Sequence, residues 1–227
     1  MTSSDNTDAI VEAALRVASA RPWREVTLAN IASEANMSLA ELSKHVASKS
    51  DILRAFMRQT DRRLLASLGS EPVEGDGHDR LFDIMLRRFE LLAPYKRAIA
   101  NIARSPDGSP SEWFDLLSGA LDSQGWALAA AGLETPGFKG DLHRLGLARV
   151  HAAALRVWIE DDDPGLARTM AALDRALRDG EAVMRRLETP IALCTSFLRA
   201  FREFRTARGG QTSESKATDG AGHETAD

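Results

Sequence analysis

The sequence predicts an all-α protein in which a three-helix N-terminal module precedes a larger helical bundle. Apolar residues recur at helical spacing through most of the chain, and alanine and leucine are frequent, whereas aromatic residues make up 6% of the sequence. The eight prolines fall mostly between these periodic stretches. Helix-start signatures also follow one another closely near the N-terminus, at Thr27, Ser38 and Ser48. Together these features favour helices over strands.

The composition, 44% hydrophobic and 27% charged, is that of a soluble globular protein. Cys194 is the single cysteine, which excludes an internal disulfide or a multi-cysteine zinc site and is consistent with a reducing compartment. The first residues carry no export signal, and no run of about 18 apolar residues indicates a membrane span. We therefore expect a cytoplasmic protein.

The charge of the chain is unevenly distributed along the sequence. The net charge is −4, of which residues 1–68 carry +1 and the remaining residues carry −5. A protein that coats nucleic acid without regard to sequence would be strongly basic, so this function is not indicated. The small positive excess at the N-terminus has the sign expected of a segment that contacts phosphates.

The N-terminal module is expected over residues 8–68, after a flexible segment at residues 1–7. An apolar stripe predicts its first helix over residues 8–20. Residues 21–23, Arg-Pro-Trp, end this helix, because the residue before a proline is displaced from the helical region. A long helix that starts at Ser48 closes the module and connects it to the rest of the chain.

Two short helices inside this module are predicted to meet at a sharp turn. Thr27 is the expected N-cap of the first, which runs to about Ala35, and Ser38 forms a capping box with Glu41 at the start of the second. The connection includes Asn36, and asparagine is one of the few non-glycine residues that tolerate the left-handed conformation. This arrangement is a helix-turn-helix, whose second helix fits the major groove of DNA.

The segments Val26–Leu42 and Ala47–Leu53 resemble, in order and spacing, the N-terminal signature of TetR-family transcriptional regulators. The resemblance implies a homodimer that binds double-stranded DNA and an unknown apolar small molecule. It also implies that Thr27 and Lys49 contact phosphates. It further implies that five residues lie on or near the groove-facing side of the second helix: Ser38, Ala40, Ser43, Lys44 and His45.

Some positions depart from the family pattern. The family usually has a tyrosine and a phenylalanine where this chain has Ser43 and Val46, and a glycine where it has Asn36. These departures predict weakened contact with bases and phosphates. Each candidate also has a structural alternative: Thr27 can be a plain N-cap, and Lys44 can belong to a solvated helix face.

Residues 76–187 are predicted to form a helical bundle for ligand binding and dimerisation. Apolar stripes predict successive helices over residues 81–93, 95–104, about 113–128, 141–160 and from Asp163 onward. The helix over residues 141–160 is apolar on most sides, which indicates a central position or an interface. An amphipathic basic helix is expected over residues 190–208, and a disordered tail over residues 209–227.

The candidate ligand-binding residues are aromatic and apolar side chains together with one histidine. They are Phe89, Trp113, Leu117, Trp126, His151, Leu155 and Trp158. Core packing is the alternative role for each of them. A turn before a capped helix explains the three aspartates at residues 161–163, so no metal site is predicted. The sequence contains no catalytic constellation or cofactor motif, so we expect neither an enzyme nor a cofactor.

Two functions are compatible with these features. The first is a ligand-responsive TetR-like regulator that binds a pseudo-palindromic operator as a homodimer. Residues Asp79–Tyr95, Arg156–Pro164 and Thr169–Leu177 also resemble the lipid-binding accessory proteins of ubiquinone biosynthesis, which share the TetR fold. That alternative implies a lipid ligand, a weakened or lost DNA-binding role, and peripheral membrane contact through residues 190–208.

Overall fold

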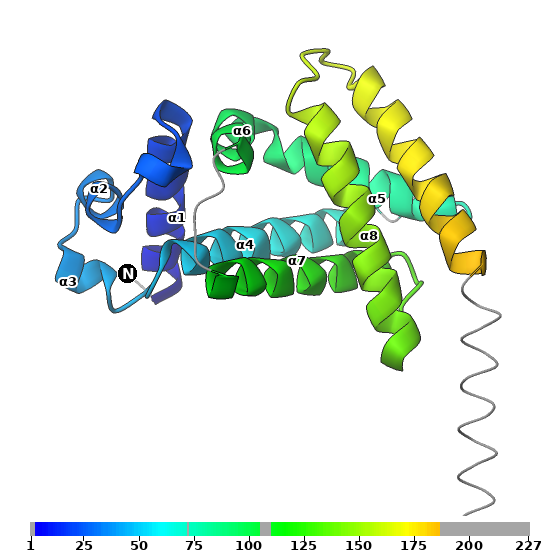
Figure 1. Ribbon diagram of the computed structural model, residues 1–227, viewed down its shortest axis with the longest axis horizontal. Helices are drawn as coiled ribbons and strands as arrows, with labels where there is room; N and C mark the ends of the chain where they lie inside the picture. Colours follow the sequence, from blue (N-terminus) through cyan, green and yellow to red (C-terminus); the bar gives the residue numbers. More distant parts are fainter. Residues whose placement is uncertain (1–2, 72, 105–109, 187–227) are drawn as a thin grey trace, which may run out of the picture. The chain divides into compact units, whose positions relative to one another are not determined.

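The computed structural model describes residues 3–71, 73–104 and 110–186, and the regular structure among these residues is helical throughout, which confirms the all-α prediction. The predicted helix over residues 190–208 and the predicted tail over 209–227 lie outside the described residues. A last helix is described over residues 167–186. The elements before it are α1 (Ser3–Ala20), the 3-10 turn η1 (Trp23–Glu25), α2 (Leu28–Glu34), α3 (Leu39–Leu42), α4 (Lys49–Ser70), α5 (Gly77–Leu92), the 3-10 turn η2 (Ala93–Tyr95), α6 (Lys96–Arg104), α7 (Pro110–Ala130) and α8 (Gly137–Trp158) (Figure 1).

Among the described residues, those up to Gly180 form one compact unit, which contains two hydrophobic cores. The buried residues of the first core lie between Ile10 and Ala55, with Ala98 added from α6. Those of the second core lie between Leu64 and Leu177. The helix α4 contributes to both cores, so it joins the predicted N-terminal module to the predicted bundle without a break between them.

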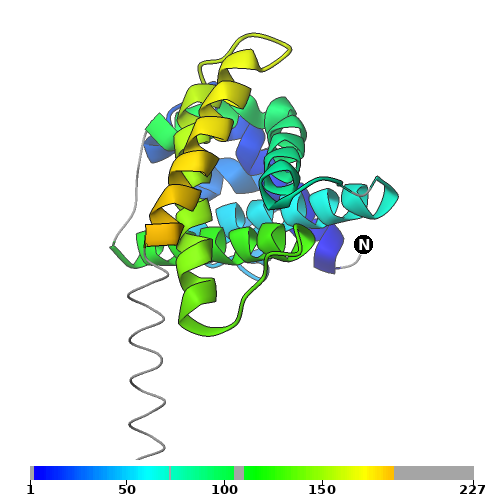
Figure 2. The ribbon, with the colours of Figure 1, turned by 90° about the vertical axis from the view of Figure 1, so that its right-hand side faces the viewer.

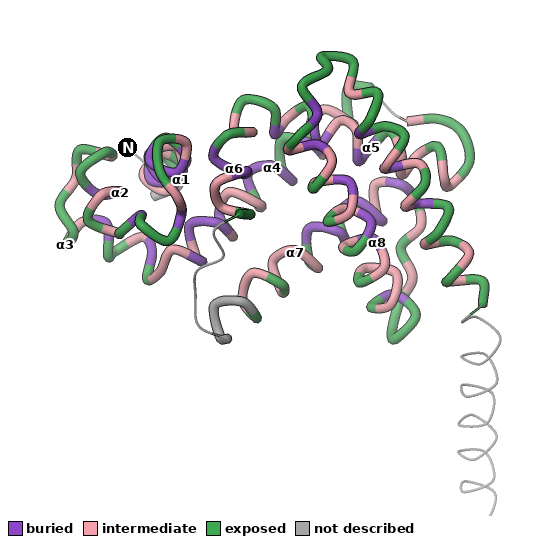
Figure 3. The backbone as a smooth tube through the Cα atoms, turned by 45° about the horizontal axis from the view of Figure 1, so that its top comes forward, coloured by how far each residue is buried: buried purple, intermediate pink, exposed green. Residues whose placement is uncertain are grey.

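Helix α1 supplies the centre of the first core. Its residues Ile10, Val11, Ala14 and Ala18 are almost completely buried, and they follow the helical spacing that predicted the stripe. Figure 3 shows these buried positions along α1, beside the largely exposed turns of α2 and α3. The structure differs from the expectation at residues 3–7, which are helical where a flexible segment was predicted. An acidic residue in the first turn, Asp5, favours this early start because it complements the helix dipole.

All three predicted N-caps are present. The Thr27 hydroxyl accepts a hydrogen bond from Asn30 N at 3.1 Å, and the Asn30 side chain accepts from Thr27 N in return, so α2 begins with a complete capping box. The Ser38 hydroxyl accepts from Glu41 N, and the Ser48 hydroxyl accepts from Asp51 N, each at 3.1 Å. Each of these caps satisfies a backbone N–H that the first turn of a helix leaves unpaired.

The turn between α2 and α3 has the backbone conformation that the sequence predicted. Asn36 has a φ of 54°, in the left-handed region. Met37 N then donates to Ala32 O, and Asn36 N donates to Ser33 O, so the last carbonyls of α2 are paired within the turn. This turn ends α2 and redirects the chain into α3.

Five helices, α4 to α8, surround a hollow beside the second core. Helices α4 and α7 run side by side, and α5 and α8 pack on α7 (Figures 1 and 2). The largest fully buried side chains of this region are Trp158, Phe89, Leu64 and Ile84. Complete burial of a side chain of this size contributes about 1.5–3 kcal/mol. The core therefore fixes how these helices are placed around the hollow.

The turn after α8 accounts for the aspartates at residues 161–163. Asp161 is buried and accepts hydrogen bonds from Thr169 N at 2.8 Å and from the Thr169 hydroxyl at 2.7 Å. These bonds, the hydroxyl's above all, lower the pKa of the Asp161 carboxyl. Asp163 accepts from Ala167 N at 3.2 Å and so caps the helix over residues 167–186. This helix therefore begins a few residues after the predicted start, because Leu166 takes a φ of 53°.

Two glycines of α8 are expected to respond oppositely to alanine. A Cβ on Gly140 would lie 1.9 Å from the Thr135 backbone oxygen, whereas a Cβ on Gly146 would meet nothing within 4 Å. We expect Gly140→Ala to lower the free energy of unfolding by about 1–3 kcal/mol, because backbone cannot move aside as a side chain can. Gly146→Ala is expected to raise it by about 0.5–1 kcal/mol. Urea unfolding measures both, and equal stability of the two variants would contradict this account.

Candidate nucleic-acid interface and ligand cavity

The candidate groove-facing residues lie together from the N-cap of α3 to the turn that follows it, whereas Thr27 caps α2 and Lys49 begins α4. Helix α3 has only four residues and continues into a hydrogen-bonded turn, in which His45 N donates to Leu42 O. The candidates on this surface that are exposed to solvent are Ser38, Ala40, Ser43 and Lys44. Leu42 and Val46 are buried in the first core and hold the segment in place. The structure thus brings these candidates together, and their contact with DNA stays a prediction.

Glu41 is a charged residue of this surface that the sequence analysis assigned only to a cap. Its side chain does not close the predicted capping box, because it pairs with Lys44 Nζ at 2.6 Å and approaches His45 Nε2 at 3.5 Å. The hydrogen bond from Lys44, followed by the charge of Lys44, lowers the pKa of the Glu41 carboxyl. The spacing of these residues on one helix face is the signal that would have indicated this pair.

His45 is the most enclosed of the candidates on this surface. Its Nε2 lies 3.4 Å from Asn6 Nδ2, so the early start of α1 brings the N-terminus of the chain against the turn after α3. Ser43, which stands where an aromatic residue was expected, is exposed and its hydroxyl donates to Ala40 O at 2.9 Å. Val46, the other residue that stands where the family usually has an aromatic side chain, is buried and packs in the first core.

Lys49 binds the protein's own backbone. Its Nζ donates to Trp23 O at 3.1 Å and to Val26 O at 3.0 Å, and it lies 5.1 Å from the centroid of the Trp23 ring. These contacts tie the first turn of α4 to the segment before α2 and therefore place α2 relative to α4. The lysine side chain stabilises the module whether or not it also contacts a phosphate.

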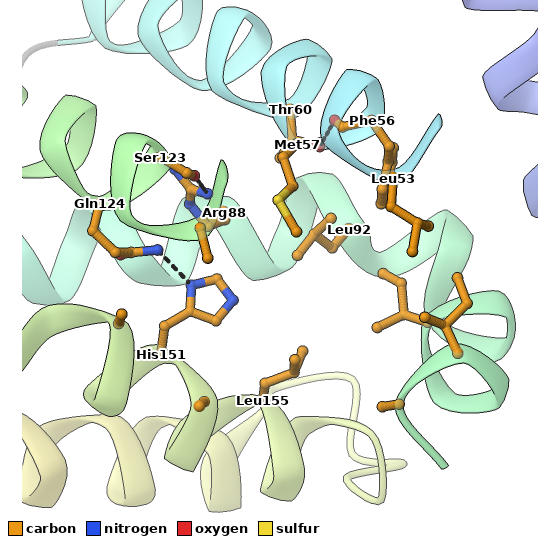
Figure 4. A pocket seen from close by; sticks show the side chains of 16 residues that line it. Leu53, Phe56, Met57, Thr60, Arg88, Leu92, Ser123, Gln124, His151 and Leu155 are labelled. Atoms are coloured by element: carbon orange, nitrogen blue, oxygen red, sulfur yellow. Dashed lines mark hydrogen bonds between the residues drawn. The ribbon is translucent and has the colours of Figure 1, made fainter. Parts of the chain in front are cut away.

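A cavity of about 300 Å³ lies among α4, α5, α6, α7 and α8. Apolar side chains form most of its wall, and those from α4 are Leu53, Phe56 and Met57 (Figure 4). The polar lining residues include Arg88, Ser123, Gln124 and His151. A mostly apolar cavity with a few polar groups is typical of small-molecule sites.

The Arg88 guanidinium is neutralised inside the protein. Arg88 is 3% exposed, and its Nη2 donates to Asp61 Oδ1 at 2.6 Å, while its Nη1 donates to the Ser123 hydroxyl. Ser123 in turn donates to Asp61 Oδ1 at 2.7 Å. This buried network joins α5, α4 and α7 at the polar wall of the cavity. No local sequence pattern predicts this network, because its members lie far apart in the chain.

His151 and Gln124 are the other polar groups of this wall. Gln124 Nε2 lies 3.5 Å from His151 Nδ1 (Figure 4), and Gln124 Oε1 is buried with no hydrogen-bond partner among the described residues. Burial, followed by the nearby charge of Arg88, lowers the pKa of His151 to about 3. The imidazole is therefore neutral at physiological pH.

The predicted ligand-binding residues fall into three groups. His151 and Leu155 line the cavity. Phe89 and Trp158 lie outside the lining as fully buried residues, with the Phe89 ring 5.4 Å from the His151 ring and 5.6 Å from the Trp158 ring. The remaining residues are Leu117 and Trp126, which are largely exposed, and Trp113, whose side chain lies outside the described residues.

Trp126 lines a second hollow of different chemistry. Its wall contains Arg54, Arg58 and Arg144 together with the acidic residues Asp61, Asp122 and Glu134. The opposite charges balance, so this hollow offers no net charge to a ligand.

Among the described residues, no helix is long and apolar enough to cross a membrane.

These features define a helix-turn-helix protein whose connecting helix also lines an apolar cavity. In sequence, the family described as "Bacterial regulatory proteins, tetR family" matches residues 10–56. No curated protein matches the chain significantly. Residues 10–56 are therefore the N-terminal domain of the tetR family.

Solved structures with the same fold are TetR transcriptional regulators. The regulator from Nitrosomonas europaea ATCC 19718 has a TM-score of 0.61 at 19% identity, covering 77% of this chain and 97% of that chain. The regulator from Rhodococcus sp. RHA1 has a TM-score of 0.59 at 18% identity, covering 77% and 94%. The tetR-family regulator from Streptomyces coelicolor has a TM-score of 0.51 at 18% identity, covering 89% and 100%. The chain thus has the fold of this family, whose members are transcriptional regulators and not enzymes.

Proposed function

We propose that the protein is a cytoplasmic, dimeric transcriptional regulator in which a small molecule in the cavity changes DNA binding by the helix-turn-helix. The observation that carries this proposal is the position of α4. Leu53 of α4 lines the cavity and is also buried in the first core, which holds α3 through Leu42 and Val46. A ligand that displaces this part of α4 therefore changes the packing behind α3.

Exposed apolar side chains on the last helices support pairing with a second copy of the chain. Leu145 of α8 is 52% exposed, and Met170 of the following helix is 36% exposed. A symmetric dimer would cover such residues and present two copies of α3 to two half-sites. The operator is then a pseudo-palindrome whose half-site spacing depends on the dimer geometry.

A selection from random duplex DNA with the purified full chain tests the proposed function. We expect a pseudo-palindromic sequence to be enriched, and its affinity to fall as the salt concentration rises. The ligand need not be known for this experiment. Recovery of random sequence only would contradict the proposal.

Two lysine variants separate DNA contact from stability of the module. Lys44→Ala is expected to weaken operator binding and to reduce the salt slope by about 1, because a cationic side chain is lost from the groove-facing surface. Lys49→Ala is expected to weaken binding similarly and also to lower the free energy of unfolding by about 1.5–3 kcal/mol, because two hydrogen bonds from a charged group disappear. Lys139→Ala, on α8, is the control for DNA contact and should leave the operator affinity unchanged, because α8 lies outside the helix-turn-helix. An unchanged operator affinity in Lys44→Ala would contradict a contact between this lysine and DNA.

The lipid-binding accessory function stays an alternative prediction. Its membrane-contact segment, residues 190–208, lies outside the described residues. It predicts that isoprenoid lipid is purified with the protein and that removal of residues 190–227 abolishes liposome binding. Mass spectrometry of extracted ligands and liposome flotation measure these two properties.

A further inference from the structure

We propose that the cavity selects an uncharged, largely apolar molecule whose polar group is a hydrogen-bond acceptor placed against His151 Nε2. This inference rests on the proposed function only in taking the cavity to be the ligand site. It specifies the chemistry of that ligand.

The described lining of the cavity offers no uncompensated charge. Its one permanently ionised residue is Arg88, whose two terminal nitrogens are bound to Asp61 and Ser123, while its buried Nε has no partner among the described residues. Asp61 accepts hydrogen bonds from both Arg88 and Ser123. A carboxylate or ammonium ligand would therefore lose its hydration without gaining a counter-ion, which is costly in an apolar site.

The hydrogen-bonding role of His151 is set by Gln124. In the structure the amide nitrogen of Gln124, which can only donate, lies 3.5 Å from His151 Nδ1, so with the amide in this orientation Nδ1 accepts. The proton of the neutral ring is then on Nε2. Figure 4 shows this nitrogen on the side of the ring that faces the interior of the cavity, and no group among the described residues hydrogen-bonds to it. His151 thus offers one N–H donor to a ligand.

The remaining wall is apolar on several sides of this donor. Leu92 and Leu155 lie on the side of the cavity that Nε2 faces, and Met57 lies across from the ring (Figure 4). The nearby Thr60 hydroxyl is engaged, because it donates to Phe56 O at 3.0 Å. A ligand that fills this space with carbon and directs a carbonyl, ether or hydroxyl oxygen at Nε2 leaves no polar group of its own unpaired.

Three probes of similar size test this inference directly. Benzophenone carries a carbonyl oxygen, 1,1-diphenylethylene replaces that oxygen with a methylene group, and diphenylacetate carries a negative charge. We expect benzophenone to bind about 3- to 10-fold more tightly than 1,1-diphenylethylene, which is the effect of one neutral hydrogen bond. Diphenylacetate is expected to bind most weakly. Isothermal titration calorimetry with the full chain measures the three affinities.

The His151→Leu variant identifies the donor. It should bring the affinity for benzophenone to that for 1,1-diphenylethylene, while the control Leu155→Ile, at another lining position, should preserve the ratio of the two affinities. Equal affinities in the unmodified protein, tighter binding of diphenylacetate, absence of binding of all three probes, or an unchanged ratio in His151→Leu would each overturn the inference. The comparison of benzophenone with 1,1-diphenylethylene in the unmodified protein tests the inference even if a variant does not fold.

The probe titrations contain no DNA, so they test the ligand inference separately from the proposed DNA-binding function. Selection of an operator by a protein that shows no preference for benzophenone would overturn the ligand inference alone. The expected order of probe affinities in a protein that selects no DNA sequence would overturn the regulator function alone.

Discussion

Asp61→Ala is expected to lower the free energy of unfolding by about 3–5 kcal/mol, the largest loss that we predict for a polar substitution in this protein. The cause is the Arg88 guanidinium, which is 3% exposed and would lose the carboxylate bonded to it. The Ser123 hydroxyl would also lose its acceptor, which lies at 2.7 Å. Guanidinium chloride unfolding followed by circular dichroism measures the loss.

Two controls distinguish the cost of an unpaired charge from the value of the ion pair. The double variant Asp61→Leu with Arg88→Met removes both charges and should recover most of the stability, since well-packed apolar residues often replace a buried pair without loss. Arg178→Ala breaks an exposed pair with Asp174, and should cost at most about 1 kcal/mol because solvent screens that pair. If Asp61→Ala and Arg178→Ala were equally stable, the buried network would have no energetic role.

Phe89→Ala is expected to cost about 3–5 kcal/mol, because it leaves a cavity at the centre of the second core. Phe89 is completely buried and contacts both the His151 ring and the Trp158 ring. Phe89 lies outside the cavity lining and packs against the His151 ring, so its predicted contact with a ligand stays a prediction. Removing it should therefore also weaken the preference for benzophenone over 1,1-diphenylethylene, because the His151 ring becomes less well positioned.

The matched control for this variant is Phe114→Ala, on α7. Phe114 is 72% exposed, and its removal is expected to change the free energy of unfolding by no more than about 0.5 kcal/mol. Urea unfolding of both variants measures the difference. A Phe89→Ala protein that loses as little stability as Phe114→Ala would show that the second core does not depend on this ring.

The sequence determined the features that depend on residues close together in the chain. The caps at Thr27, Ser38 and Ser48 each involve a backbone N–H three residues later, and the left-handed turn depends on Asn36 itself. Such interactions are complete within one helical turn, so a short segment specifies them. For the same reason the helix-turn-helix could be predicted with its order and spacing.

Only the tertiary structure decided which side chains surround the cavity. Asp61 is 27 residues from Arg88 and 62 from Ser123, so no local pattern connects the members of the buried network. Residue type did not reveal which face of a helix is turned inward: Phe89 and Trp158 are in the core, and Trp126 is exposed. Periodicity identifies an apolar face, but the packing of several helices determines whether that face meets the core, a cavity or solvent. The module is therefore encoded locally, whereas the cavity exists only where distant helices meet.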